Sequence, residues 1–271
     1  MDPRYPRERN VDRRRLLAAA APAAAALLAA CSDSAPAPRR PGRRRRGRPR
    51  ALVYRGPAVC PGCAESAAAL LRGAPRPCAV TYCGPRERVP LSADSLADAE
   101  VYVQAGGPDD VDGAWTEVRG SARAVREWVR AGGRYLGFCM GGYLAGSDPG
   151  FGLLPGDTDA YTTTPGASVR TSRDTVIAVR WRGRERHMYF QDGPYFDLRK
   201  GADATVLATY GNGTVAALVA PFGEGRVGVS GPHPEADRSW YDEAGLSNPD
   251  GVRLDLGHDL VEVTTAASGR R

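Results

Sequence analysis

Residues 132–144, which read GGRYLGFCMGGYL, constrain the fold of this chain more than any other segment. A short apolar run ends in Cys139 and glycines follow at once, the pattern of a buried strand that enters a sharp turn and then a helix. Gly137 and Gly141 leave room for that turn, because a Cβ at either position would crowd its apex. At such an apex Cys139 can act as a nucleophile, with backbone N–H groups at the helix start available to an oxyanion. The alternative is an inert, buried thiol.

A second segment, residues 226–235 (RVGVSGPHPE), supplies the groups that a nucleophilic thiol needs. An apolar run is again followed by residues with reactive side chains, here His233 and Glu235. A thiol needs a base to become a thiolate, and the base needs a carboxylate to fix its tautomer. The chain has only three histidines, so one in a His-Pro-Glu sequence directly after a strand is a specific signal. We therefore predict a triad of Cys139 as nucleophile, His233 as base and Glu235 as the residue that orients it.

The first half of the globular part alternates between strand-like and helical segments. We predict strands at 51–55, 79–82, 100–104 and 135–138, and helices at 61–71 and 118–131. Such alternation implies parallel strands joined by right-handed crossovers, and hence an α/β fold with a doubly wound sheet. Ligands of such sheets bind beyond the carboxyl ends of the strands. Gly106–Gly107, Cys139 and His233 all fall at such ends.

After about residue 150 the pattern becomes β-rich. Segments 176–181, 187–190, 204–210, 215–220 and 225–229 are separated by turn residues, and 182–184 is suited to a hairpin tip. We predict antiparallel additions to the same sheet rather than a separate domain. Residues 243–271 have no strong pattern and are expected to form a weakly structured tail, in which His258 has no assigned role.

Four motifs together resemble a known family: LVYRGP at 52–57, QAGG at 104–107, GFCMGGY at 137–143 and GPHPE at 231–235. They are similar to the N-terminal domain of eukaryotic biotin–protein ligases, within the class I glutamine amidotransferase-like superfamily. The resemblance covers residues 51–242 and implies a flavodoxin-like, mostly parallel sheet and a Cys-His-Glu triad. The N–H groups of Gly107 and Met140 are the candidates for its oxyanion hole.

Tyr143 departs from the pattern of the glutamine-hydrolysing relatives. They carry Gln at this position, so Tyr143 argues against glutamine hydrolysis while agreeing with the biotin-ligase N-terminal family. We expect no ligase or synthase domain beside this one, no cofactor and no metal. Gly106, Tyr143, Gln191 and Asp192 are further candidates for the pocket, although Gln191–Asp192 also suits an ordinary turn.

The N-terminus has the pattern of an export signal. Residues 13–17 (RRRLL) form a charged region of twin-arginine type, and the chain then stays apolar up to residue 30. This region ends in LAAC at 28–31, which resembles the lipobox of bacterial lipoproteins. We predict a signal peptide over 1–31, lipid attachment at Cys31 and a location on the outer face of the cell membrane. A plain cleaved signal and an uncleaved Ala-rich anchor are the alternatives.

Residues 32–50 form a predicted disordered linker rich in Arg and Pro. Residues 1–50 hold 14 of the basic residues and 4 of the acidic ones, so the remaining 23 basic and 27 acidic residues make the globular part mildly acidic. A basic tether beside a lipid would strengthen attachment to an anionic membrane, and a plain spacer is the alternative. No nucleic-acid partner is expected.

The other four cysteines are Cys60, Cys63, Cys78 and Cys83. Export favours oxidation, so a local Cys60–Cys63 disulfide is the first interpretation, ahead of a redox-active pair or part of a zinc site. Cys78 and Cys83 lie five residues apart on a short strand and point to opposite faces, so they are not expected to pair with each other.

Two functions of different classes fit this sequence. The first is an exported cysteine hydrolase acting on an amide or ester of unidentified structure, and the intact triad favours it. The second is a catalytically inactive module that binds a small molecule or a partner in the same pocket. The absence of a glutamine-site residue and of a partner domain favours the second.

The lipobox can be tested by metabolic labelling with a fatty acid. We expect the full-length protein to be labelled and Cys31→Ala to remain unlabelled, because that sulfur carries the lipid. Equal labelling of both proteins, or of neither, would contradict the prediction.

Overall fold

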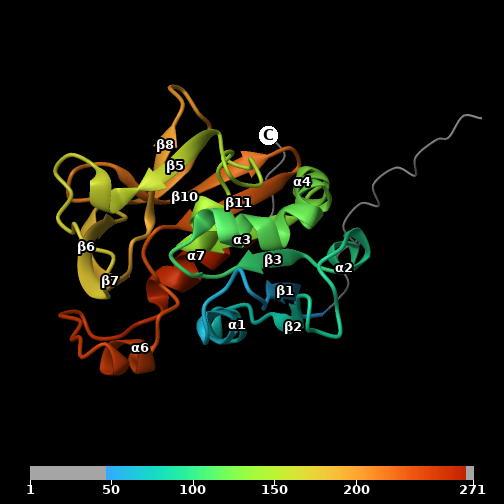
Figure 1. Ribbon diagram of the computed structural model, residues 1–271, viewed down its shortest axis with the longest axis horizontal. Coiled ribbons are helices and arrows are strands. Elements are labelled where there is room, and N and C mark those ends of the chain that lie inside the picture. The colour runs from blue at the N-terminus through green and yellow to red at the C-terminus, as the bar shows by residue number, and fades with distance from the viewer. Residues whose placement is uncertain (1–46, 267–271) are drawn as a thin grey trace, which may run out of the picture. The chain divides into compact units, whose positions relative to one another are not determined.

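The computed structural model describes residues 47–266 (Figure 1), so the predicted signal peptide and all of the linker up to residue 46 lie outside the described residues. The strands are β1 (Arg50–Tyr54), β2 (Ala79–Cys83), β3 (Val101–Gln104), β4 (Arg134–Phe138), β5 (Gly156–Ala160), β6 (Thr175–Trp181), β7 (Arg184–Phe190), β8 (Pro194–Leu198), β9 (Thr205–Tyr210), β10 (Val215–Phe222) and β11 (Gly225–Ser230). The helices are α1 (Cys63–Gly73), α2 (Ala93–Ala97), α3 (Val111–Val118), α4 (Ala122–Arg130), α5 (Met140–Tyr143), α6 (Arg238–Glu243) and α7 (Asp255–Thr265), with 3₁₀ turns η1 (Arg119–Ser121) and η2 (Tyr161–Thr163).

The eleven strands of the described residues belong to one mixed sheet with the order β2-β1-β3-β4-β11-β10-β9-β6-β7, while β8 pairs with β10 and β5. The pairs from β2 to β11 are parallel, and those from β11 to β7 are antiparallel. This confirms the predicted α/β fold, with antiparallel strands added by the second half of the chain to the same sheet.

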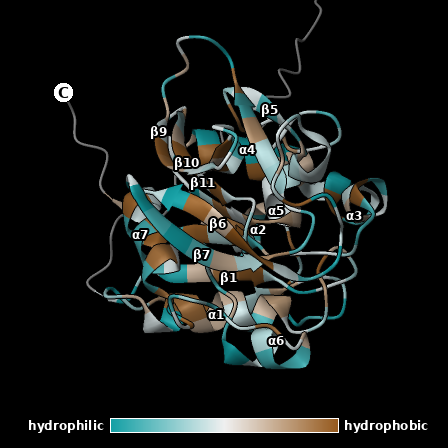
Figure 2. Cartoon of the chain, turned by 90° about the vertical axis from the view of Figure 1, so that its left-hand side faces the viewer, coloured by the Kyte–Doolittle hydropathy of each residue, from teal (hydrophilic) through white to brown (hydrophobic). Residues whose placement is uncertain are grey.

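The core consists mainly of two apolar clusters that share the strands between them. Strand β3 shows the division: Val101 and Val103 belong to one cluster and Tyr102 to the other, because successive side chains leave a strand on opposite sides. Residues of α1 and α7 complete the first cluster, and those of α3 and α4 the second. In Figure 2 the exposed first half of edge strand β7 is largely hydrophilic and its buried end apolar.

The predicted helix over 118–131 is corrected by the structure. Val118 ends α3 instead, the turn η1 follows, and α4 begins only at Ala122. Gly120 lies in that turn, and the Asp110 carboxylate caps α3 by accepting the Gly113 N–H at 2.9 Å. The apolar face of α4, with Val125, Trp128 and Val129 buried, is as predicted.

The C-terminal segment is also corrected. Residues 243–271 were expected to be weakly structured, yet residues 255–265 form the regular helix α7, which packs against β4, β10 and β11. Leu256, Leu260 and Thr264 are spaced by four residues and form its buried stripe. Gly228 of β11 leaves the room for this contact, because an added Cβ would collide with the Thr264 hydroxyl. Polar residues among these positions obscure the stripe in the sequence.

The linker boundary moves slightly as well, since Arg50, predicted as its last residue, begins β1. No helix among residues 47–266 is long and apolar enough to cross a membrane.

The packing of α7 can be tested by substitution. Leu260 is fully buried, so Leu260→Ala should lower the free energy of unfolding by about 2–5 kcal/mol through lost contacts and the cavity left behind. Glu262→Ala, on the exposed side of the same helix, is the matched control and should change it little. Urea denaturation measures both, and equal stabilities would show that α7 is dispensable.

Candidate active site

Three neighbouring parallel strands bring the predicted site together. Strand β4 leads to Cys139, β3 to Gly106–Gly107 and β11 to His233. In the registers, Gln104 lies opposite Gly137 and Phe138 opposite Ser230, so the three carboxyl ends are level. The Cys139 N–H extends the ladder by donating to the Ser230 carbonyl at 2.9 Å.

Cys139 occupies the apex of the predicted turn. Its φ of +47° is rare for a residue other than glycine, and α5 begins at the next residue. Gly141 explains how α5 can lie so close to the sheet, because an added Cβ would collide with the Gln104 carbonyl. The thiol is buried, with 8% of the residue exposed.

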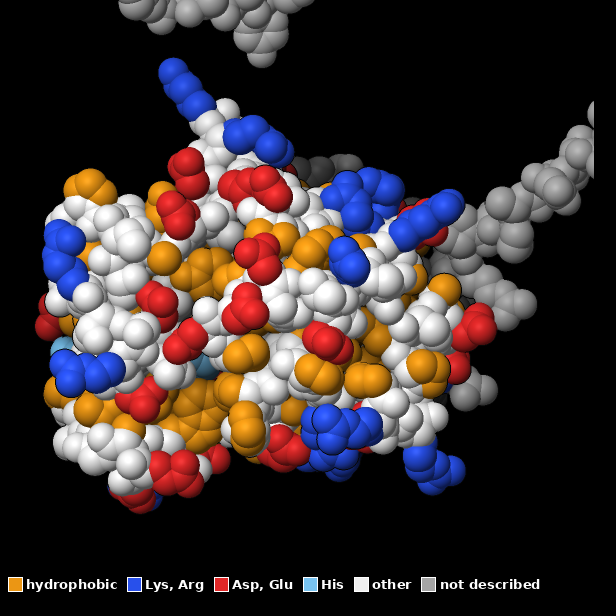
Figure 3. All heavy atoms as spheres, in the orientation of Figure 1, with side chains coloured by type: hydrophobic (Ala, Val, Ile, Leu, Met, Phe, Trp, Pro, Cys, Tyr) orange, Lys and Arg blue, Asp and Glu red, His pale blue; other side chains and the backbone are white. Residues whose placement is uncertain are grey.

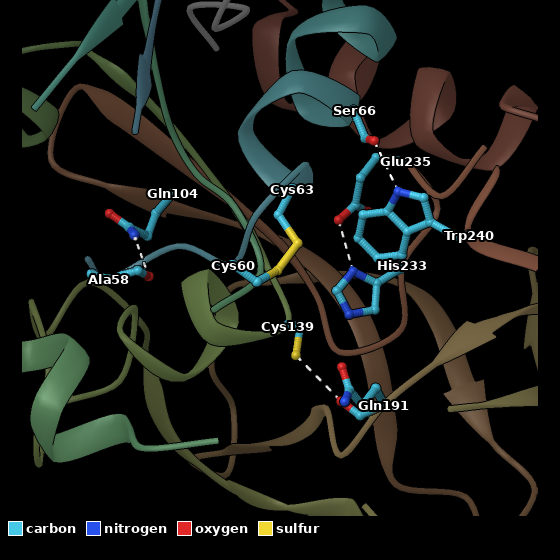
Figure 4. Close-up of a disulfide and its surroundings, with 10 residues drawn as sticks. All are labelled: Ala58, Cys60, Cys63, Ser66, Gln104, Cys139, Gln191, His233, Glu235 and Trp240. Atoms are coloured by element: carbon cyan, nitrogen blue, oxygen red, sulfur yellow. Dashed lines mark hydrogen bonds and ion pairs between the residues drawn. A yellow bond between two sulfur atoms is a disulfide. The ribbon is translucent and has the colours of Figure 1, made fainter. Parts of the chain in front are cut away.

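His233 and Glu235 form a buried pair beside the thiol (Figure 4). His233 Nδ1 lies 2.8 Å from Glu235 Oε1, so the carboxylate can accept a hydrogen bond from the Nδ1–H group. The other ring nitrogen, Nε2, then faces Cys139. Nε2 makes no hydrogen bond within the described residues. Burial alone would lower the pKa of His233, but the negative charges of Glu235 and of Cys139 as thiolate raise it to about 10.

The predicted oxyanion hole has two free donors. Within the described residues, no hydrogen bond uses the backbone N–H of Gly107 or of Met140. The two residues are in contact, since a Cβ added to Gly107 would lie 2.7 Å from Met140 Cγ and 2.8 Å from the Ala58 carbonyl oxygen. Gly106 is equally tight, because its Cβ would lie 2.7 Å from His233 Cε1.

Buried Gln104 supports this loop, a role that the sequence analysis missed. Its amide donates to the Ala58 carbonyl at 3.4 Å and accepts from the Tyr102 hydroxyl at 2.7 Å. Gln104 stands in the QAGG motif, so its place beside the glycines was visible, but its contact with the Ala58 carbonyl joins segments 46 residues apart.

Cys60 and Cys63 form a disulfide, with Cα atoms 5.5 Å apart, beside the site (Figure 4). The Cys60 N–H donates to the Gly106 carbonyl at 3.0 Å, which ties this loop to the glycine pair. Cys78 and Cys83 are free thiols in opposite apolar clusters, as their spacing predicted. Burial raises the pKa of Cys78 to about 11 and that of Cys83 to about 12, so neither competes with Cys139 for an alkylating reagent.

The other two pocket candidates, Gln191 and Asp192, also lie at the site, in the turn after β7. The Cys139 thiol donates to the Gln191 carbonyl at 3.5 Å, and the Tyr143 hydroxyl donates to the Asp192 carbonyl at 2.9 Å. Tyr143 thus contacts this turn.

A cavity of about 560 Å³ adjoins the site and was not foreseen. Its walls include the disulfide loop, Gln191, Tyr189 and Trp240, and the last two rings pack against His233 at 5.9 and 5.0 Å between centroids. Four acidic residues and no basic ones line it: Glu65, Asp174, Asp237 and Glu243. Acidic side chains also gather at the lower left of the face in Figure 3, where Figure 1 places α6. They are scattered along the sequence, so only the fold assembles them.

A solved structure shares this fold, and a second is more distantly similar. A protein from Thermoplasma acidophilum described as a GMP synthase subunit has a TM-score of 0.52 and 13% identity, over 80% of this chain and 94% of its own. A glutamine amido transferase from Methylobacillus flagellatus has a TM-score of 0.45 and 14% identity, over 83% and 98%. The first likeness shows a common fold, and the second is too distant to carry an argument.

Residues 50–160 match the family described as "Biotin-protein ligase, N terminal". The predicted resemblance is therefore confirmed for this segment, which contains Cys139 but ends before His233 and Glu235. No curated protein matches the chain in sequence.

The acidic lining of the cavity can be tested with two alkylating reagents, one negatively charged and one neutral. Glu243→Gln should speed the reaction of Cys139 with anionic iodoacetate by about twofold, the effect of one nearby charge partly screened by water, and leave neutral iodoacetamide unchanged. Mass spectrometry of the Cys139 peptide gives both rates. Glu262→Gln, outside the cavity, is the control, and equal effects on the two reagents would contradict the prediction.

Proposed function

We propose that this protein is a cysteine hydrolase that acts on an amide or ester. The observation that carries the proposal is the position of Cys139, at the apex of a strained turn beside the buried His233–Glu235 pair. Surface histidines and structural cysteines do not need this arrangement, whereas nucleophilic catalysis does.

The chemistry follows from the positions of the groups. Cys139 and His233 share one proton, and when it lies on His233 the sulfur is a thiolate. The thiolate attacks the carbonyl carbon, and the N–H groups of Gly107 and Met140 stabilise the resulting oxyanion. His233 then gives its proton to the leaving amine or alcohol, which leaves a thioester on Cys139. Water attacks the thioester, His233 takes its proton, and the acid product departs as the thiol is restored.

The substrate class is narrowed by two features. Tyr143 stands where glutamine-hydrolysing relatives have Gln, so glutamine is not the proposed substrate. The acidic cavity that Gln191, Tyr189 and Trp240 share with the site favours substrates with neutral or positively charged groups. The finer fold assignment, a doubly wound flavodoxin-like sheet, is part of this proposal and is supported by helices in both apolar clusters.

Export and lipid attachment at Cys31 are proposed with it, together with added attachment through the basic residues 39–50. They are supported by the signal-like N-terminus and by the Cys60–Cys63 disulfide, since disulfides persist in oxidising compartments.

The second candidate function, an inactive binding module, is favoured by one contact. The Cys139 thiol donates to the Gln191 carbonyl, while His233 Nε2 has no hydrogen bond within residues 47–266. A pocket that only binds a ligand could keep this arrangement.

Alkylation by iodoacetamide tests the thiol. We expect Cys139 to react readily at about pH 6.5, and at least about tenfold more slowly in His233→Ala, because the imidazolium stabilises the thiolate. Glu235→Gln should cause a smaller loss, since it disturbs the orientation of the base but leaves it in place. A Cys139 that is indifferent to His233 would contradict the triad.

Turnover needs a separate measurement, because a binding module can also have a reactive thiol. Incubation with a library of amides and esters should leave an acyl group on Cys139 that mass spectrometry detects, and Cys139→Ser provides the control. A reactive thiol that no member of the library acylates would favour the binding module.

A further inference from the structure

The side chains of Cys139 and Tyr143 both contact the loop between β7 and β8, residues 191–193, which is called the turn below. Cys139 donates to the Gln191 carbonyl at 3.5 Å, and Tyr143 donates to the next carbonyl, that of Asp192, at 2.9 Å. The Tyr143 N–H also bonds to the Cys139 carbonyl at 3.0 Å, so the two residues are one turn apart.

Other contacts hold the turn from its far side. The Thr162 hydroxyl donates to Asp192 Oδ1 at 2.6 Å, and Asp192 has a φ of +43°, a conformation that needs support in a residue other than glycine. Gly193 packs on the loop before His233, because an added Cβ would collide with the Gly231 carbonyl. The position of the turn is therefore determined by the residues around it.

Two groups compete for the sulfur of Cys139. The Gln191 carbonyl accepts an S–H proton but its lone pairs repel a thiolate, whereas a protonated His233 attracts one. The position of the carbonyl thus affects the protonation of the thiol. The ionisable groups near this contact include His233, Glu235 and Tyr210. Asp192 in the turn, Asp159 and Asp109 act on Tyr143.

We propose that Tyr143 is a positioning residue whose hydroxyl holds the turn, and with it the Gln191 carbonyl, against Cys139, which slows the reaction of the thiol until a substrate displaces the turn. This inference rests on the proposed function, because it describes how the same thiol is controlled. Gln191 also lines the acidic cavity, so displacement of the turn changes the wall between cavity and thiol.

The test compares Tyr143→Phe with the wild-type protein in the alkylation of Cys139 by iodoacetamide. The variant loses only a hydroxyl, so at about pH 6.5 we expect a rate about fivefold higher, which corresponds to the loss of one hydrogen bond. At about pH 9, where more of the thiol is ionised in both proteins, the difference should shrink. A change in packing alone would not produce this dependence on pH.

Tyr195→Phe on β8 is the matched control, because the Tyr195 hydroxyl makes no hydrogen bond within the described residues, and it should react like the wild type. Thr162→Val removes the second tether of the turn and should also speed the reaction at low pH. Melting temperatures show whether each variant is folded. If Tyr143→Phe does not fold, the alkylation rate of Thr162→Val tests the positioning of the turn instead.

His233→Ala separates the two proposals. If this variant is slow while folded Tyr143→Phe and Thr162→Val react like the wild type, the positioning role of Tyr143 is overturned and the triad stands. If His233→Ala also reacts like the wild type, the proposed function itself has failed. Faster alkylation of Tyr143→Phe at every pH to the same degree would indicate simple opening of the site and would also overturn the proposal.

Discussion

The candidate site depends on the parallel pairing of β3, β4 and β11. Because the three strands run in the same direction and are neighbours, their carboxyl ends meet at one edge of the sheet. The bond from the Cys139 N–H to the Ser230 carbonyl continues the β4–β11 ladder to the turn itself. A slip of one residue in this ladder would turn the side chains of β11 to the other face and separate His233 from Cys139.

Glycines at this edge allow the loops to approach more closely than other residues would permit. Gly106 lies against His233, Gly107 against Met140, and Gly141 against the end of β3. Each contact would be lost with a Cβ, so the glycines serve the geometry of the site and not flexibility. The disulfide loop and Gln104 then hold the glycine pair from the outside.

Electrostatics give the thiol two opposing neighbours. The buried Glu235 raises the pKa of His233, and a protonated His233 favours a thiolate, while the Gln191 carbonyl favours a neutral thiol. The proposed hydrolysis and the proposed role of Tyr143 are therefore linked through one sulfur atom. Gln191 also lines a cavity with four acidic side chains, which would disfavour negatively charged groups there.

The sequence by itself determined the elements whose signals are local. The apolar runs of β4 and β11, the glycines around Cys139 and the His-Pro-Glu motif were sufficient to predict the mixed α/β sheet and the pairing of residues at its edge. They also predicted the opposite environments of Cys78 and Cys83. Only the tertiary structure decided what depends on contacts between distant segments. The helix α7 gains its stability by burying Leu260 under the sheet, Tyr143 meets Asp192 from 49 residues away, and four scattered carboxylates line one cavity. Local patterns cannot encode such contacts, because each depends on how the strands pair.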